Sequence, residues 1–177
     1  VGKEPMGELQ VEGIYPLSYI RALTGEARVE RVFARTTSHF HQAHADNNID
    51  DLATVSLEMD NGIIASFCLG RIGAAAHPDI GEIKLHLIGD KGAMVITEAR
   101  PEVAIYYKGQ ATTEFKHQRI ADENNYLFAE NFAQSIDGEA VPILDAHGAR
   151  DICATVIAAL DSAKSGKPVC PQRRSSS

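Results

Sequence analysis

Two runs of apolar and β-branched residues, joined by a tight turn, are the feature that most constrains the fold of this chain. The runs extend from Leu52 to Met59 and from Ile63 to Leu69, and Asp60-Asn61-Gly62 joins them. These turn residues tolerate the positive φ angles that a tight hairpin requires. The sequence therefore predicts an antiparallel β-hairpin.

Strand patterns continue on both sides of this hairpin. Alternation from Arg28 to His41 predicts a long strand, and two further pairs are expected, Ile83 to Ile88 with Ala93 to Thr97 and Val103 to Tyr107 with Thr112 to His117. In the long strand, one face is predicted to carry Val32, Ala34 and Phe40, and the other Arg31, Arg35, His39 and His41. The middle of the chain is thus an antiparallel meander.

Helical spacing of apolar residues appears towards both chain ends. It predicts one helix from Ile14 to Leu23, a second carrying Ala129, Phe132, Ala133 and Ile136 on one face, and a third from Asp145, a good N-cap, to Gly166. Strands in the middle with helices at the ends are typical of the α+β class, here an open antiparallel β-sheet with helices packed on one face.

Composition excludes several classes of partner. The net charge is −7 and the basic residues are scattered, which argues against nucleic acid. No apolar stretch approaches the roughly 18 residues of a membrane-spanning helix, and no leader pattern is present, so a cytoplasmic protein is expected. Cys68, Cys153 and Cys170 have no metal-binding or disulfide spacing, and the first two are expected in core positions.

Several short motifs occur in a characteristic order. They are Gly13-Ile14-Tyr15-Pro16-Leu17, Asp50-Asp51-Leu52-Ala53, Asp60-Asn61-Gly62, Ile88-Gly89-Asp90-Lys91-Gly92, Val141-Pro142 and the closing Ser162-Ala163-Lys164-Ser165-Gly166-Lys167-Pro168-Val169. In this order and spacing, over about residues 7 to 169, the chain resembles the C-terminal domain of the glucose-fructose oxidoreductase and inositol dehydrogenase (Gfo/Idh/MocA) family.

This resemblance implies a domain that shapes the substrate pocket and forms a homo-oligomer, a dimer or tetramer, through the free face of its sheet. Members of the family bind NAD or NADP through an N-terminal Rossmann domain. None of the 14 glycines completes the GxGxxG fingerprint of such a domain. Residues 1–177 are therefore expected to be a single substrate-binding and oligomerisation domain, without the Rossmann domain and without tight cofactor binding of its own.

The resemblance also assigns a catalytic candidate. Tyr15 occupies the position where the family carries a His or Tyr near the reacting carbon, two residues after Gly13. A phenol hydroxyl donates a proton at neutral pH but is a poor base. The family's Asp position is Val11, and Ser18 stands where many members keep a second Asp. The alternative for Tyr15 is simple packing at a helix N-terminus.

Four further residues are candidates for substrate binding: His39, His41, Arg71 and His77. The two histidines of the long strand, followed by His44, Asp46, Asp50 and Asp51, supply the directional donors and acceptors that a sugar requires. Zinc or iron binding is the weaker alternative for this cluster. Arg71 and His77 flank a loop of small residues that lets a ligand approach the backbone, or Arg71 only extends from a strand end.

These observations predict the C-terminal domain of an NAD(P)-dependent oxidoreductase that acts on a sugar, polyol or related cyclic alcohol, inactive as this chain alone. A stand-alone, non-catalytic binding or scaffold module is the first alternative, because it accounts for Val11 and for the missing fingerprint. A metal enzyme built on the histidine cluster is the second.

Overall fold

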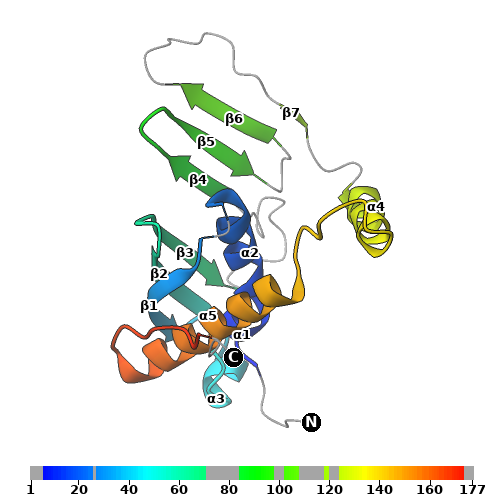
Figure 1. The fold of residues 1–177 in the computed structure, drawn as a ribbon. Helices are drawn as coiled ribbons and strands as arrows, with labels where there is room; N and C mark the ends of the chain where they lie inside the picture. The colour runs from blue at the N-terminus through cyan, green and yellow to red at the C-terminus, as the bar shows by residue number, and fades with distance from the viewer. Residues whose placement is uncertain are drawn as a thin grey trace. The chain divides into compact units, whose positions relative to one another are not determined.

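The computed structural model describes residues 6–25, 27–70, 84–97, 102–107, 118–119 and 124–173. Their elements, in chain order, are α1 (Glu8–Glu12), α2 (Ile14–Leu23), β1 (Val29–Thr37), α3 (Gln42–Asp46), β2 (Leu52–Met59), β3 (Ile64–Gly70), β4 (Lys84–Ile88), β5 (Gly92–Thr97), β6 (Glu102–Tyr107), β7 (Gln118–Arg119), α4 (Asn124–Ile136) and α5 (Ala146–Ser165) (Figure 1). They belong to two compact units, one of Val1–Ile72 with Leu144–Ser177 and one of Gly73–Ile143.

The sheet of the first unit is antiparallel and has the order β1-β2-β3. The predicted hairpin is confirmed, because β2 pairs with β3 from Leu52 opposite Gly70 to Glu58 opposite Ile64. Gly62 in its turn has φ +84°, a conformation that side chains with a Cβ rarely adopt. The C-terminal segment adds a bridge to the other edge, where Val169 exchanges backbone hydrogen bonds with Val32 of β1.

The hydrophobic core lies on one face of this sheet. Register places Val32, Leu57 and Ala65 in one row and Ala34, Val55 and Phe67 in the next. Against these rows pack Leu9 of α1, Leu17 and Ile20 of α2, and Ile152, Val156, Ala158 and Ala159 of α5. The predicted α+β class, with an open antiparallel sheet and helices on one face, is confirmed.

The second unit contains an antiparallel sheet of order β4-β5-β6-β7. Its first hairpin matches the prediction closely, with Leu85 opposite Ile96 and Leu87 opposite Met94. The described strands thus fall into two sheets rather than the one that the sequence pattern predicted. The strand expected from Thr112 to His117 lies outside the described residues, and the short β7 is the partner of β6.

The predicted helices are confirmed at their capped ends. Asp145 caps α5 by accepting a hydrogen bond from the backbone N–H of Gly148, and Gly166 ends the helix with φ +68°. In α4, Asn131 bonds the backbone of Val141 and Ile143, which fixes the segment after the helix. The apolar stripe predicted for α4 is exposed, with Phe132 65% and Ile136 70% accessible.

Some sequence predictions are wrong in detail. The strand expected to reach His41 ends at Thr37, so Phe40 is not on the core face and His39 and His41 are not side by side on a strand. Cys68 and Cys153 are exposed rather than buried. Every helix in the described ranges is too short or too polar to cross a lipid bilayer.

Candidate functional site

Tyr15 lies in the first turn of α2, directly after a sharp corner between α1 and α2. Gly13 occupies this corner, and a Cβ at that position would stand 2.4 Å from the carbonyl oxygen of Leu9. Only glycine therefore allows the two helices to meet this closely. Pro16 is tolerated in the first helical turn, where its missing N–H removes no helical hydrogen bond.

Helix α2 is anchored on one side and open on the other. Leu17 and Ile20 are buried in the core, whereas Tyr15 is 50% and Tyr19 36% exposed. Tyr15 and Tyr19 are four residues apart and so share one face of the helix. Ser18 adjoins them, and its hydroxyl donates to the carbonyl of Ile14 at 2.7 Å. The open face of α2 thus presents two aromatic rings on a rigid support.

The hydroxyl of Tyr15 makes no hydrogen bond to any residue that the structure describes. Half of Tyr15 is accessible and half is covered by the chain. A helical aromatic residue with an accessible hydroxyl can stack on the apolar face of a sugar ring and exchange a hydrogen bond with a substituent.

Asp50 fixes the start of α1 and thereby the corner that carries Tyr15. Its Oδ2 accepts a hydrogen bond from the backbone N–H of Leu9 at 3.0 Å, and its carbonyl accepts one from the N–H of Glu8. Gly7 is required for this contact, because a Cβ there would lie 1.8 Å from Asp50 Oδ1. The carboxylate satisfies a helix N-terminus that has no side-chain cap of its own.

Asp51 holds the loop that carries the candidate histidines. Its buried carboxylate accepts hydrogen bonds from the backbone N–H groups of His39, Phe40 and His41 at distances of 2.8 to 3.1 Å. Burial raises the pKa of Asp51, but the three backbone donors and the charge of the nearby His41 together lower it further, so the net pKa is below its ordinary value. A stable charge therefore orders the turn between β1 and α3.

The histidine side chains leave this turn for the surface. His39 and His41 are both exposed. The rings of His41 and His44 lie 5.0 Å apart and tilted by 57°, and the ring of His39 contacts that of Phe40 edge to face. Among the described residues, no three His, Cys, Asp or Glu side chains are placed to hold a metal ion.

The structure describes three of the five predicted site residues. Tyr15, His39 and His41 are all exposed, but no hydrogen bond or ring contact joins Tyr15 to either histidine within the described ranges. Arg71 and His77 lie outside the described residues.

Two residues important to this region were not singled out from the sequence. Tyr19 stands on the same face as Tyr15, and its spacing of four residues was the available signal. Asp51 accepts hydrogen bonds from a loop ten to twelve residues earlier in the chain, and no local sequence pattern predicts these contacts.

The described residues do not fit a dinucleotide cofactor. Such a site needs a parallel strand, a glycine-rich turn and a helix whose N-terminal amides hold the pyrophosphate. Every strand pair in the described part of the chain is antiparallel.

These features define a class: an α+β domain with open antiparallel sheets, one of them covered by helices on a single face, and with an exposed tyrosine at a glycine corner. Residues 3–170 match the oxidoreductase family, C-terminal alpha/beta domain. The chain belongs to this family, the Gfo/Idh/MocA oxidoreductases that the motif order indicated.

Solved structures with the same fold include three that carry ligands or activities in their names. The WlbA dehydrogenase from Bordetella pertussis, in complex with NADH and UDP-GlcNAcA, is 17% identical with a TM-score of 0.66, over 95% of this chain and 46% of that one. UDP-N-acetylglucosamine 3-dehydrogenase GnnA from Acidithiobacillus ferrooxidans is 16% identical with a TM-score of 0.69, over 86% and 45%. An oxidoreductase from Agrobacterium radiobacter, in complex with NAD+, L-tartaric acid and magnesium, is 16% identical with a TM-score of 0.73, over 94% and 51%.

At these identities the likeness shows the fold alone. This chain spans about half the length of the solved structures that it matches. No curated protein matches it in sequence.

Proposed function

We propose that this chain is the substrate-binding part of an NAD(P)-dependent oxidoreductase that acts on a sugar, a polyol or a related cyclic alcohol. Its membership of the oxidoreductase family supports the reaction class. Solved structures of the same fold include a UDP-N-acetylglucosamine dehydrogenase and a dehydrogenase in complex with a UDP-sugar acid, which supports the substrate class. The cofactor would be bound by a segment corresponding to the half of those structures that this chain does not span.

The observation that carries the proposal is the half-exposed side chain of Tyr15 on an anchored helix. Gly13 and the buried Leu17 fix the direction of α2 and with it the backbone position of Tyr15. A hydroxyl with no protein partner in the described chain has its donor and acceptor sites available to a carbinol oxygen. In reduction Tyr15 would donate its phenol proton to the substrate carbonyl oxygen, and in oxidation its phenolate would take the same proton back from the carbinol.

His39, His41, Arg71 and His77 are proposed to contact the polar groups of the substrate. Asp51 supports this role for the two earlier histidines, because it fixes their backbone while both side chains stay exposed. The exposed ring of Tyr19 is proposed to add a stacking surface beside Tyr15.

The experiment is a steady-state assay of the full-length protein, with any cofactor-binding segment included, in the presence of NAD+ or NADP+ and a panel of polyols, sugars and UDP-sugars. Tyr15→Phe keeps the ring and removes only the hydroxyl. We expect kcat to fall by about 100-fold or more, the usual contribution of a general acid or base, with an unchanged Tm. Tyr126→Phe is the control, because Tyr126 is an exposed tyrosine of α4 that is not part of the candidate site, and its kcat should stay close to that of the native enzyme.

An enzyme that oxidises a substrate equally well with Tyr15→Phe would remove Tyr15 from the reaction. A protein that binds a sugar but reduces neither NAD+ nor NADP+ would instead be the non-catalytic binding module. Val11 favours that second candidate, because it places an apolar side chain where the family carries an aspartate.

A further inference from the structure

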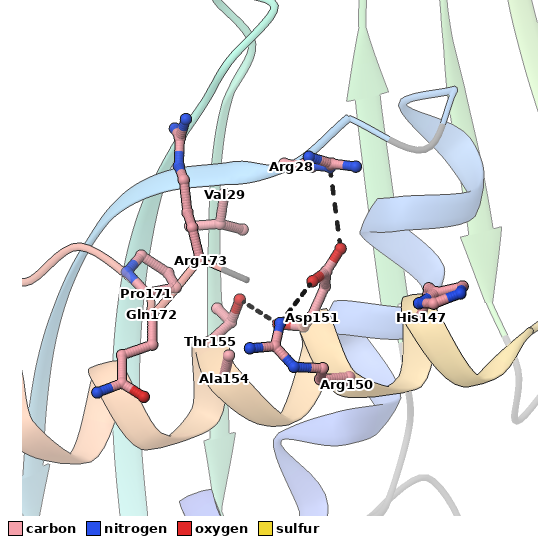
Figure 2. A pocket seen from close by; sticks show the side chains of 10 residues that line it. All are labelled: Arg28, Val29, His147, Arg150, Asp151, Ala154, Thr155, Pro171, Gln172 and Arg173. Atoms are coloured by element: carbon pink, nitrogen blue, oxygen red, sulfur yellow. Dashed lines mark hydrogen bonds and ion pairs between the residues drawn. The ribbon is translucent and has the colours of Figure 1, made fainter. Parts of the chain in front are cut away.

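A pocket of about 350 Å³ lies in the first compact unit, between the start of β1, the first half of α5 and the C-terminal segment. Its walls carry Arg28, Arg150 and Arg173, one from each of these segments. Tyr15, His39 and His41 do not line it, so the pocket is separate from the candidate substrate surface. Figure 2 shows Arg28 and Arg150 directed toward Asp151, whereas the side chain of Arg173 extends away from this carboxylate.

The charge of this pocket is opposite to that of the chain. The whole sequence has a net charge of −7, yet three arginines line the pocket against a single carboxylate, Asp151. His147 adds a fourth nitrogen-bearing side chain. Such a local excess of positive charge attracts anions even to an acidic protein.

The arginine heads are poorly satisfied by the protein itself. Asp151 lies 3.9 Å from Arg28 Nε and 3.7 Å from Arg150 Nη1, and Glu30 lies 4.0 Å from Arg173 Nη2. All three distances exceed hydrogen-bonding length, so these contacts are loose ion pairs. None of the three guanidinium groups donates a hydrogen bond within the described part of the chain. Their planar N–H donors remain available to an oxyanion.

The site also has an apolar part. Val29, Ala154 and Pro171 complete the wall between the arginines. The volume is at the lower end of the range for small-molecule pockets, roughly 300 to 1,000 Å³. It suits one phosphate group with a small organic residue and is too small for a whole dinucleotide.

We infer that this pocket binds a small phosphate monoester, with Arg28 and Arg150 holding the phosphate and the apolar wall contacting the organic group. Arginine is suited to this task because its planar donors match two oxygens of a phosphate at once. Asp151, the one carboxylate among the lining residues, would compete with the phosphate for the two arginines.

The test is isothermal titration calorimetry of the purified protein at low salt with glucose 6-phosphate, glucose and inorganic phosphate as probes. We expect saturable binding of glucose 6-phosphate at one site, no binding of glucose, and weaker binding of inorganic phosphate. Arg28→Gln and Arg150→Gln should each weaken binding by about tenfold. Arg31→Gln is the control, because Arg31 is an exposed arginine of β1 that pairs with Glu58 away from the pocket.

Asp151→Asn should change the affinity for glucose 6-phosphate in the opposite direction from the arginine variants. Removing this carboxylate takes a like charge away from the phosphate and should tighten binding by about fivefold. A merely structural role of Asp151 predicts no tighter binding. If Asp151→Asn lowers the stability of the protein, Arg28→Gln and Arg150→Gln still test the inference.

Three results would overturn the inference: no binding of glucose 6-phosphate, equal loss of affinity with Arg31→Gln, or equal affinity for inorganic phosphate. None of them bears on Tyr15 or on hydride transfer, so the proposed function is tested separately.

Discussion

The carboxylate of Asp50 accepts a hydrogen bond from the backbone N–H of Leu9, 3.0 Å away and 41 residues earlier in the chain. This contact joins the loop before β2 to the first turn of α1. Because α1 runs directly into the Gly13 corner and α2, the position of Tyr15 depends on a residue far from it in the sequence.

Asp50→Ala is expected to destabilise the first unit. The change leaves the N–H of Leu9, a fully buried residue, without its charged acceptor, which costs about 2 kcal/mol in the free energy of unfolding. Urea denaturation of the purified protein measures this difference. Asp46→Ala is the matched control, because Asp46 is an exposed aspartate whose side chain bonds Gln42 and no other residue in the described ranges, and it should change stability by less than about 0.5 kcal/mol. Equal effects of the two variants would show that the Asp50 contact does not stabilise α1.

Asp51 predicts a pH dependence of stability. Its folded-state pKa is lowered, so its contribution is fully present above its ordinary value of 3.8 and is lost as the pH falls below it towards the folded-state pKa. Asp51→Asn should therefore lower the Tm at pH 7, and the gap to the native protein should narrow as the pH falls below about 4. Thermal unfolding followed by circular dichroism from pH 7 to pH 3 checks this.

The control for the pH series is Asp161→Asn, which neutralises an exposed aspartate of α5. This variant should follow the native curve throughout. A gap for Asp51→Asn that stays constant down to pH 3 would contradict the role assigned to its charge.

Asp50 and Asp51 also show where prediction from the sequence stops. The hairpin from Leu52 to Gly70 and the ends of α5 were predictable, because their signals lie within the elements themselves. Helix α1 has no side-chain cap of its own, since its acceptor is Asp50, and it was not predicted. The strand predicted to reach His41 ends at Thr37. Beyond that end the backbone N–H groups of His39 to His41 donate hydrogen bonds to the carboxylate of Asp51 instead of to a neighbouring strand.

The sequence predicted only part of the candidate sites as well. Tyr15 was identified by motif order, and its exposure follows from the helical spacing that buries Leu17 and Ile20. The pocket of Arg28, Arg150 and Arg173 has no sequence signal, because its residues come from three separate segments. Cys68 was misassigned to the core by a shift of one residue: Phe67 and Leu69 face the core, so Cys68 faces outward.

Ser162 predicts a clear stability effect at the join between α5 and β1. Its buried hydroxyl accepts from the N–H of Ala34 at 3.0 Å and donates to the carbonyl of Lys167 at 2.6 Å. Ser162→Ala leaves both groups unpaired and should lower the free energy of unfolding by about 2 kcal/mol. Ser165→Ala, one turn later with contacts of only 3.4 Å, should change it by less than about 0.5 kcal/mol. If both alanine variants unfold at the native urea midpoint, the Ser162 bridge contributes nothing to stability.

The open face of the β1-β2-β3 sheet is the proposed surface for forming a homo-oligomer. Phe33, in the middle of the edge strand β1 and opposite Ser56, is 37% exposed on this face, and Ile64 is 80% exposed in the neighbouring row. A buried glutamate without a partner is strongly unfavourable in an interface, so Phe33→Glu should convert the assembly to monomers without lowering the stability of each subunit. Light scattering coupled to size-exclusion chromatography measures the mass. Ile157→Glu places the same charge on an exposed isoleucine of α5, on the helical side of the unit, and should keep the native mass. A native mass for Phe33→Glu, or a monomeric native protein, would show that this face is not the interface.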